Sequence, residues 1–310
     1  KQFLGALKDI GLNASVIEFP AGEASKNINT ALDISKQLME MGADRETCLI
    51  ALGGGVVGDM VGFIASIFMR SVPYLQIPTT LVAQVDSSIG GKTGIDLPFG
   101  KNLLGTFYQP GAVFASLHFL ETLPEKEYNN GLAEIIKYGI IDDEKMFRAL
   151  EDNMDAIKSR DPKRMLNLVE TCCQIKKSVV EIDEREQGLR RILNFGHTLG
   201  HALESVSNYA ITHCEGVAMG MIAAAHLSGK MGYLKNHEAD RIEALIHRAG
   251  LPVTIPKSLD GDKIITRLKM DKKRKGDIVH FVLLKKIGMP FIHGNMEDKM
   301  IAAVIEEMKK

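Results

Sequence analysis

The hydrophobic pattern of the first third of the chain alternates between helix and strand. An amphipathic helix is predicted over 29–41, and Gly42 suits its C-terminal cap. Buried-strand patterns cover 47–52 and 72–77, and a helix spaced by glycine and alanine is predicted between them over 56–69. Strand–helix–strand units of this kind imply a parallel sheet covered by helices.

After residue 121 the periodicity becomes mostly helical. Helices are predicted over 127–139, 143–158, 162–181, 196–207, 215–231 and 238–249, and one strand pair over 277–284 and 289–293. With 310 residues, we expect two domains: an α/β, Rossmann-like N-terminal domain over 1–121 and a mostly α-helical C-terminal domain over 122–310. The chain starts without Met, inside a helical pattern over 1–10, so we expect that an N-terminal piece is missing.

Composition is that of an ordinary globular enzyme, with 45% hydrophobic and 25% charged residues. The net charge of -1 gives no reason to expect a nucleic acid or an anionic membrane as partner. The 4 cysteines form no disulfide framework and no Cys-x-x-Cys pair, which predicts a reducing cytoplasm. The apolar run over 216–225 is too short to span a membrane and is interpreted as a buried helix.

A histidine-rich stretch carries the first candidate chemistry. His197 and His201 are four apart and share one helix face, with Asn194 one turn earlier and His213 further along. Three imidazoles among glycines and apolar residues indicate a divalent metal site. The alternative that two of them are ordinary hydrogen-bonded helix histidines stays open. Thr198 stands where the zinc-protease signature needs Glu, which excludes that class.

A glycine-rich turn follows the first strand. Residues 53–59 satisfy the pattern G-x-G-x-x-G between a strand and a helix, which favours a dinucleotide whose pyrophosphate lies at the helix N-terminus. The acidic residue expected about 20 positions later is missing, because 74–80 contains no carboxylate. We favour a variant dinucleotide site with Thr79 and Thr80 as hydroxyl contacts, and glycines selected for packing remain the alternative.

A second glycine-rich region, interpreted as a loop over 85–105, carries two lysines. Gly91-Lys92-Thr93 resembles the end of a phosphate-binding P-loop, but Asp86 stands where that motif needs Gly. Lys92 and Lys101 in such a loop still suit a phosphate-bearing ligand. Two solvated lysines in a flexible loop are the alternative.

A carboxylate and further cations lie in the C-terminal half. Glu134 and Lys137 are three apart on a predicted helix face with apolar neighbours, so Glu134 is a candidate metal ligand, or one half of a surface salt bridge. A candidate anion pocket, suited to a substrate with phosphate and carboxylate groups, combines Lys92, Lys101, Lys176, Lys177, Arg190, Arg191 and Asn194.

These motifs together resemble the 3-dehydroquinate synthase family. The matching segments are 53–59, 77–81, 84–92, 101–102, 131–139, 194–201 and 213–221. The resemblance implies an N-terminal dinucleotide-binding domain, a helical metal-binding domain, an active site in the cleft between them, and a homodimer. It also implies NAD and one zinc or cobalt ion as cofactors, and a small sugar phosphate as substrate.

The reaction implied by the resemblance converts 3-deoxy-D-arabino-heptulosonate 7-phosphate into 3-dehydroquinate and phosphate. It proceeds by transient oxidation with NAD, phosphate elimination, re-reduction and an intramolecular aldol closure. Another sugar phosphate cyclase and a metal-dependent polyol dehydrogenase remain alternatives, as does a non-catalytic binding module. Lys176 and Arg190 favour the substrate that bears a carboxylate.

The resemblance also implies a role for individual residues. The implied metal ligands are Glu134, His197 and His213. The implied NAD contacts are Glu23, Lys26, Gly55, Val56, Val57, Gly58, Asp59, Thr79, Thr80, Lys92, Lys101, Phe119, Leu120, Glu121 and Thr122. The implied catalytic and substrate residues are Asp86, Lys92, Asn102, Lys137, Lys176, Arg190, Asn194, His201, one of Lys272 or Lys273 (Lys273 is preferred), and Arg70 reaching across the dimer.

Two departures from the family pattern are visible. Cys214 follows the third histidine, where the family usually has Gly, and its thiol either perturbs the metal site or packs. The family's first strands also lie upstream of Lys1, which would explain the missing acidic residue.

Overall fold

The computed structural model describes residues 2–275, 279–294 and 296–309, except for the side chains of Gln2 and 271–275. The chain divides into two compact units. Unit 1 comprises Lys1–Pro78 and Gly91–Ala115, and unit 2 comprises Thr79–Gly90 and Ser116–Lys310. The chain therefore passes between the units at three points.

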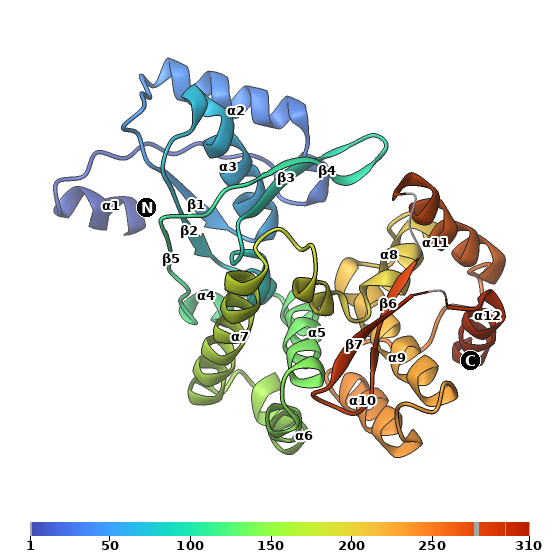
Figure 1. Cartoon of the computed structure of the whole chain (residues 1–310). Helices are drawn as coiled ribbons and strands as arrows, with labels where there is room; N and C mark the ends of the chain where they lie inside the picture. Colours follow the sequence, from blue (N-terminus) through green and yellow to red (C-terminus); the bar gives the residue numbers. More distant parts are fainter. Residues whose placement is uncertain (1, 276–278, 295, 310) are drawn as a thin grey trace. The chain divides into compact units, whose positions relative to one another are not determined.

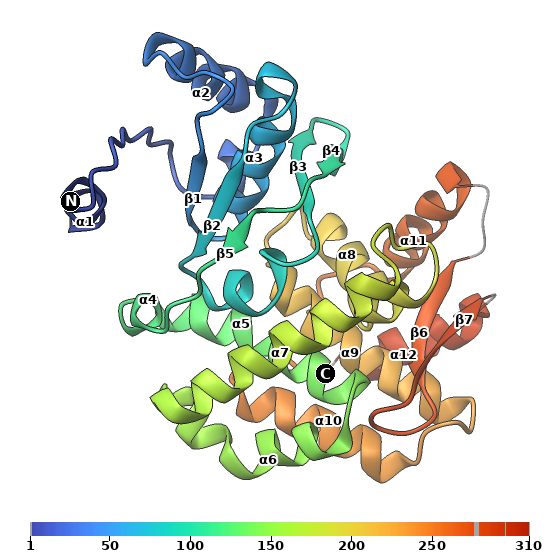
Figure 2. The same ribbon diagram turned by 60° about the vertical axis from the view of Figure 1, so that its left-hand side comes forward.

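Unit 1 is built on a parallel three-stranded sheet in the order β1-β2-β5 (Figure 1). Its strands are β1 (Leu49–Gly53), β2 (Tyr74–Pro78) and β5 (Ala112–Val113). Helix α3 (Gly55–Ile67) connects β1 to β2 and packs against the sheet, as Figure 2 also shows. The predicted strand–helix–strand unit is confirmed.

Glycines allow α3 to lie close to its neighbours in unit 1. A Cβ atom on Gly58 would lie 2.6 Å from Oε1 of Gln76, and one on Gly62 would lie 3.0 Å from the Tyr74 hydroxyl. The core of unit 1 also includes α2 (Ile28–Glu40), whose N-cap Asn27 accepts a hydrogen bond from the Thr30 main-chain N–H.

The region from 92 to 107 is an antiparallel hairpin, so its interpretation as a glycine-rich loop is wrong. Strand β3 (Lys92–Leu97) pairs with β4 (Gly100–Phe107), and Gly94 faces Gly105 across the pair. Either glycine with a side chain would collide with the facing backbone, because a Cβ on Gly94 lies 2.9 Å from the Leu104 carbonyl oxygen. These glycines therefore serve a close strand approach, a signal that resembles a loop in sequence.

The shorter elements complete the description of unit 1 and of the segment after β2. They are α1 (Gln2–Asp9), η1 (Glu23–Ser25), η2 (Phe68–Arg70) and η3 (Ala83–Ser87), the last of which belongs to unit 2.

Unit 2 is mostly helical. Its longer helices are α5 (Glu125–Ile141), α6 (Glu144–Lys158), α7 (Pro162–Ile182), α8 (His197–Val206), α9 (His213–Lys230), α10 (Asn236–Arg248), α11 (Gly261–Lys275) and α12 (Asp298–Met308). The remaining elements are α4 (His118–Glu121), η4 (Leu189–Asn194) and a hairpin of β6 (His280–Leu284) with β7 (Pro290–Gly294). The six predicted helices and the strand pair are confirmed within a few residues, although the predicted start of the first strand, 277–278, lies outside the described residues.

Helices α5 and α9 lie at the centre of unit 2. The run from 130 to 141 on α5 is buried throughout, and so is the run from 216 to 225 on α9 that was interpreted as a buried helix. A buried helix face normally carries apolar side chains only, so the charged Glu134 and Lys137 on α5 point to a site. Among the described residues, no helix combines the length and the apolar character needed to cross a bilayer.

Candidate functional site

Helices α8 and α9 cross at glycines, and this crossing brings their first turns together. A Cβ atom on Gly200 would lie 2.9 Å from the backbone of Gly216, and one on Gly220 would overlap the carbonyl oxygen of Gly196. The two main chains are therefore in direct contact. His197 begins α8 and His213 begins α9, so their rings come within 5.2 Å, centroid to centroid.

Gly220→Ala is expected to separate the two helices. Because the added methyl group overlaps a main-chain oxygen rather than a mobile side chain, the free energy of unfolding should fall by about 3 kcal/mol, and metal affinity should fall with it. Urea unfolding and metal titration measure both effects. Gly229→Ala on the same helix is the control, because the nearest atom to its Cβ lies 3.6 Å away. A Gly220→Ala protein with wild-type stability and affinity would contradict this account of the crossing.

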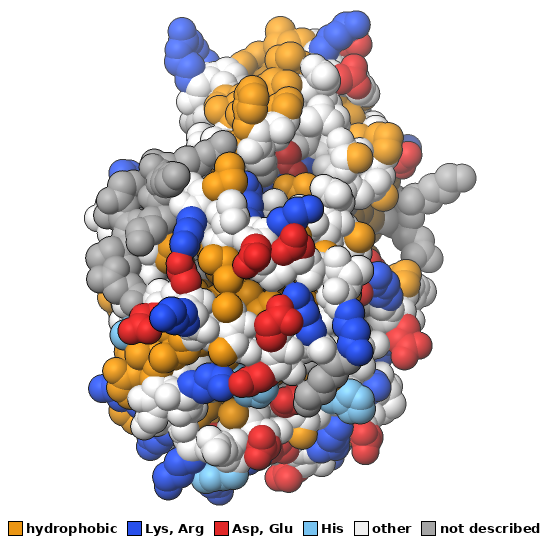
Figure 3. Space-filling model, turned by 90° about the vertical axis from the view of Figure 1, so that its right-hand side faces the viewer, with side chains coloured by type: hydrophobic (Ala, Val, Ile, Leu, Met, Phe, Trp, Pro, Cys, Tyr) orange, Lys and Arg blue, Asp and Glu red, His pale blue; other side chains and the backbone are white. Residues whose placement is uncertain are grey.

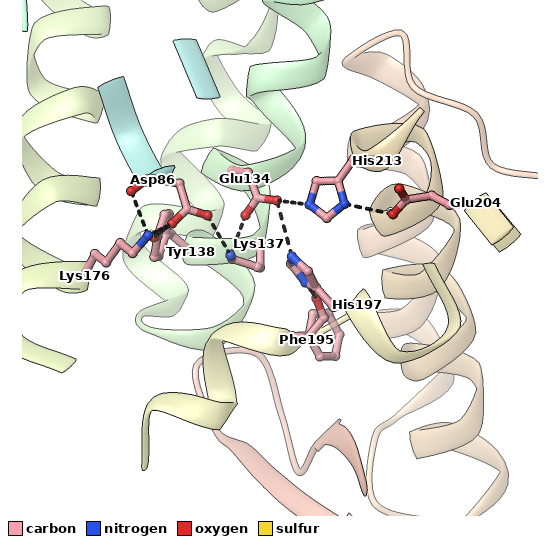
Figure 4. Close-up of polar contacts among 9 residues, drawn as sticks. All are labelled: Asp86, Glu134, Lys137, Tyr138, Lys176, Phe195, His197, Glu204 and His213. Carbon is pink, nitrogen blue, oxygen red and sulfur yellow. Dashed lines mark hydrogen bonds and ion pairs between the residues drawn. The ribbon is translucent and has the colours of Figure 1, made fainter. Parts of the chain in front are cut away.

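Three of the sequence-predicted residues converge in unit 2 as a candidate metal centre. Glu134, His197 and His213 each offer one ligand atom, and these atoms all lie within 4.8 Å of one another. Figure 4 shows both imidazoles turned toward the Glu134 carboxylate, with Nε2 of His197 at 3.7 Å and Nε2 of His213 at 4.0 Å from Oε1. One carboxylate oxygen and two imidazole nitrogens suit a divalent ion such as zinc.

Hydrogen bonds to the second ring nitrogens orient both histidines. Nδ1 of His197 lies 3.2 Å from the Phe195 carbonyl oxygen, and Nδ1 of His213 lies 2.9 Å from Oε1 of Glu204. In the neutral form of each ring, Nδ1–H donates to an oxygen and Nε2 keeps its lone pair on the side that faces Glu134. Burial lowers the pKa of His213, but the hydrogen bond to Glu204 and the charge of Glu134 outweigh it and raise this pKa, so a bound ion would displace a proton from Nε2. Burial also holds the pKa of His197 well below its ordinary value, which keeps this ring in the neutral form that binds metals. The residues present therefore fit a divalent ion.

Glu204 is a functional candidate that the sequence interpretation missed. It follows His201 by three positions and His197 by seven, so all three share one face of α8. This spacing was available as a signal. His201, His213 and Glu204 form a second, overlapping group whose ligand atoms also lie within 4.8 Å of one another.

A buried chain of alternating charges extends from the candidate metal centre, as Figure 4 shows. Lys137 Nζ forms an ion pair with Glu134 and lies 3.3 Å from Oδ2 of Asp86. Lys176 Nζ contacts the same Asp86 carboxylate and donates to its main-chain oxygen at 2.7 Å. The Tyr138 hydroxyl lies 3.1 Å from Asp86 Oδ1. The surface-salt-bridge alternative for Glu134 and Lys137 is therefore wrong, since each residue is only 1% exposed.

Burial and charge shift the pKa values in this chain of charges. Burial alone would raise the pKa of Asp86, but the ammonium groups of Lys137 and Lys176 hold it well below its ordinary value. Burial raises the pKa of Glu134, whose neighbour Asp86 adds to the effect, although Lys137 opposes it. Burial lowers the pKa of Lys176, and the nearby charges of Lys137 and Arg190 lower it further, while Asp86 opposes the shift.

Arg190 is buried beside this chain of charges, at 2% exposure. Its guanidinium donates to the Gly90 carbonyl oxygen at 3.1 Å and contacts the Glu184 carbonyl oxygen. Carbonyl groups carry no formal charge, so these contacts orient the guanidinium without neutralising it. A cation held in this way is suited to an anionic ligand group.

Three other predicted residues of this region have partners of their own. The Asn194 amide donates to the Glu186 carboxylate. Lys177 forms an exposed ion pair with Glu181, so this lysine of the predicted anion pocket is a solvated surface residue. Arg191 Nε lies 3.5 Å from the main-chain oxygen of Glu186.

Unit 1 brings together residues of the predicted NAD and substrate sets. Lys26 Nζ lies 2.6 Å from Oδ2 of Asp59 and 2.6 Å from Oδ1 of Asn102, although these partners are 33 and 76 positions away. The main-chain N–H of Asn102 also donates to Oδ1 of Asp96 at 2.7 Å. Burial raises the pKa of Glu23, despite the opposing charge of Lys26. The first turn of α3, 55–59, presents main-chain N–H groups at a helix N-terminus, which suits a phosphate.

The other predicted contacts are distributed over both units. Thr79, Thr80 and the segment 119–122 belong to unit 2, whereas Lys92 and Lys101 lie on the hairpin of unit 1. The Leu120 side chain is 3% exposed and packs in the core, and its main-chain N–H donates to the Leu117 carbonyl oxygen, so neither group faces a ligand here.

The last two predicted positions are Arg70 and Lys273. Arg70 is exposed in η2, with a positive φ of 73°. The side chains of Lys272 and Lys273 lie outside the described residues.

Comparison with known proteins identifies the family of this chain. The family descriptions "3-dehydroquinate synthase N-terminal" and "3-dehydroquinate synthase C-terminal" match residues 16–130 and 131–274. A 3-dehydroquinate synthase of Desulforamulus reducens is 47% identical over 303 residues, covering 97% of this chain and 84% of the relative. One of Thermodesulfovibrio yellowstonii is 42% identical over 308 residues, covering 99% and 86%.

Solved structures show the same fold. ValA, a 2-epi-5-epi-valiolone synthase from Streptomyces hygroscopicus with NAD⁺ and Zn²⁺ bound, has a TM-score of 0.92 at 27% identity, covering 99% of this chain and 87% of that one. A 2-deoxy-scyllo-inosose synthase with carbaglucose-6-phosphate, NAD⁺ and Co²⁺ has a TM-score of 0.90 at 29% identity, covering 99% and 86%. Glycerol dehydrogenase from Schizosaccharomyces pombe, at 15% identity and a TM-score of 0.67, shares the fold alone.

The fold and the carboxylate–histidine cluster define an enzyme of the dehydroquinate synthase-like class. The two family matches cover most of the chain, and the relatives are aligned over nearly all of it. The chain belongs to the 3-dehydroquinate synthase family.

Proposed function

We propose that this enzyme converts 3-deoxy-D-arabino-heptulosonate 7-phosphate into 3-dehydroquinate and phosphate. The observation that carries the proposal is the continuous buried contact from the candidate metal ligands through Lys137 and Asp86 to Lys176. Relatives with the name 3-dehydroquinate synthase, at 42% and 47% identity, support the same activity. Lys176 and Arg190 provide two cations for a substrate carboxylate in addition to its phosphate.

NAD and one divalent metal are the cofactors we propose. The two cyclases with TM-scores of 0.92 and 0.90 have NAD⁺ bound with Zn²⁺ or Co²⁺, and both ions suit carboxylate and imidazole ligands. Glu134, His197 and His213 would hold the ion. When bound, the ion supplies Lewis-acid polarisation of substrate hydroxyls, and NAD supplies a transient hydride acceptor.

The residues of the chain orient the substrate and hold charge. The ammonium of Lys137 stays protonated between Asp86 and Glu134, because both carboxylates raise its pKa despite burial. It therefore presents a fixed positive charge beside the metal ligands. Arg190 and Lys176 orient the carboxylate, and Asn194 and His201 contact the substrate ring. In unit 1, Lys92 and Asn102 bind substrate, while Lys26, Asp59, Lys101 and the first turn of α3 bind NAD.

Phosphate release tests the proposed reaction directly. With the heptulosonate phosphate and NAD present at well below substrate concentration, we expect phosphate to accumulate beyond the amount of NAD without net absorbance at 340 nm. A chelator should stop the release, and zinc or cobalt should restore it. Net accumulation of NADH would instead indicate a polyol dehydrogenase.

A second sugar phosphate cyclase activity is the nearest alternative, because ValA has a TM-score of 0.92. Its test is a substrate without a carboxylate, such as sedoheptulose 7-phosphate. A higher kcat/KM for that compound than for the heptulosonate phosphate would overturn our substrate assignment. Lys176 and Arg190 lead us to expect the reverse order.

The proposed partner is a small molecule. Figure 3 shows acidic and basic side chains intermixed over one face of the protein, which supports a small-molecule partner rather than a nucleic acid. The homodimer, the reach of Arg70 to a partner subunit and the cytoplasmic location stay predictions.

A further inference from the structure

Glu204 is a buried carboxylate next to the candidate metal centre. It lies on α8 with only 3% of its surface exposed. Its Oε1 accepts the Nδ1–H of His213 at 2.9 Å, and its Cγ lies 3.4 Å from the position of a Cβ atom on Gly216. A charged group is costly to bury without a specific partner. The hydrogen bond with His213 therefore provides a specific partner for the buried Glu204 carboxylate at the helix crossing.

Two roles for Glu204 are compatible with its position. It belongs to the second group of candidate ligand residues, with His201 and His213, and could bind the ion itself. It could instead act on the ion through the imidazole of His213. A neutral imidazole has one N–H donor and one lone pair, so the nitrogen that faces Glu204 decides which nitrogen remains for the metal.

The geometry favours the second role. Nδ1 of His213 is occupied by Glu204, and Nε2 lies 4.0 Å from Oε1 of Glu134. The ring thus lies between the two carboxylates, with its free lone pair toward Glu134. If Glu204 were a ligand together with His213, its bond to Nδ1 would have to be given up, and the ring would lose this orientation.

We propose that Glu204 is a positioning residue that fixes the tautomer and the orientation of His213 and does not itself bind the metal. The proposal rests on the metal site of the proposed function. Glu204 also adds negative charge, which makes the imidazole a stronger electron donor. His197 has only a main-chain oxygen in the corresponding place, so His213 is the ligand that a side chain tunes.

Glu204→Gln and Glu204→Ala separate the hydrogen bond from the charge. Gln retains an oxygen that accepts Nδ1–H but loses the charge, so zinc affinity should fall about 10-fold, whereas Ala should lower it about 100-fold. Zinc affinity is measured by competition with a chromophoric chelator. Glu243→Ala is the matched control, because it removes another carboxylate beside a histidine, His226, at 3.4 Å and away from the centre. Its zinc affinity should remain that of the wild type.

Two spectroscopic readouts distinguish positioning from ligation. In the cobalt-loaded protein, the visible absorption bands of both Glu204 variants should match those of the wild type. Matching bands would show that the number of ligands to the ion is unchanged. In the metal-free protein, at a pH high enough to make the His213 ring neutral, ¹⁵N shifts of labelled histidine should show His213 protonated on Nδ1 in the wild type and in Glu204→Gln, and a mixture of tautomers in Glu204→Ala.

Several results would overturn the proposal. Loss of a ligand from the cobalt spectrum of either variant would make Glu204 a ligand. Unchanged zinc affinity in both variants, or a neutral His213 ring protonated on Nε2 in the wild type, would remove the positioning role. If Glu204→Ala does not fold, Glu204→Gln and the wild-type ¹⁵N shifts still decide. A wild-type protein that binds no zinc would disprove the metal site of the proposed function, whichever tautomer His213 adopts.

Discussion

His197→Ala is expected to abolish metal binding and turnover while the fold of unit 2 stays intact. The substitution removes one of the three predicted protein ligands, and the methyl group that replaces the ring has no donor atom. Lewis-acid activation is worth several kcal/mol, so kcat/KM should fall on the order of 10³-fold or more. Gly196, which lies in contact with α9, is unaffected. The free energy of unfolding of the metal-free protein should therefore change by only about 1–2 kcal/mol.

Metal content after dialysis, phosphate release and urea unfolding are the measurements for His197→Ala. The control is His226→Ala on α9, which removes an imidazole of the same size paired with Glu243 at 3.4 Å. This control should keep its metal and its activity. A metal-depleted His197→Ala protein with full activity would disprove the metal role, because no ligand would then be needed for turnover.

Lys137→Met is expected to lower the free energy of unfolding of the metal-free protein by about 3–5 kcal/mol. Met has a similar length and fills most of the same space, so packing is largely retained. The lost ammonium, however, leaves Glu134 and Asp86 buried without their shared cation. Asp86 still has Lys176, so most of the destabilisation comes from Glu134. A saturating divalent ion should restore part of the stability, because it brings positive charge back to Glu134.

Lys126→Met on the same helix is the matched control. Lys126 is 64% exposed and pairs with Glu215 at 3.4 Å, so its loss should cost less than about 1 kcal/mol. Urea unfolding with and without zinc measures both variants. Equal destabilisation by the two substitutions would show that burial of the charge chain contributes nothing beyond an ordinary surface pair.

Periodicity was enough to predict most of the elements that build the two units. The helices of unit 2 have apolar faces at helical spacing, and α7 begins with the Asp161 cap and Pro162 that the sequence suggests. Helix α11 was missed, although Ile264 and Leu268 are buried at a spacing of four residues, a signal that was present. The hairpin of β3 and β4 was missed for another reason: glycines needed for close strand contact resemble those of a loop.

The site was predicted less evenly than the fold. The spacing of His197 and His201 indicates a site, but it does not reveal which imidazole faces Glu134, since that depends on the crossing of α8 and α9. The contact of Lys26 with Asn102 joins residues 76 positions apart, and no local pattern announces it. Such contacts are set by the tertiary fold, so sequence spacing cannot supply them.

Cys214 illustrates how packing answers a question that the sequence leaves open. Its thiol is 6% exposed, packs in the hydrophobic core of unit 2, and is absent from the candidate ligand groups among the described residues. Burial raises the pKa of this thiol well above its ordinary value, so it stays protonated and is a poor ligand. The departure from the family's usual Gly is therefore accommodated by packing.

Because α8 and α9 cross at glycines, the geometry of the metal site and the choice of substrate depend on different parts of the chain. The spacing between the two imidazoles is dictated by main-chain atoms, whereas the identity of the bound sugar depends on side chains elsewhere. Substitutions of those side chains can change substrate specificity without changing metal binding. A directed-evolution library that keeps the four glycines of the crossing, Gly196, Gly200, Gly216 and Gly220, should therefore yield many metal-binding proteins with altered specificity. A library that randomises these glycines should yield few.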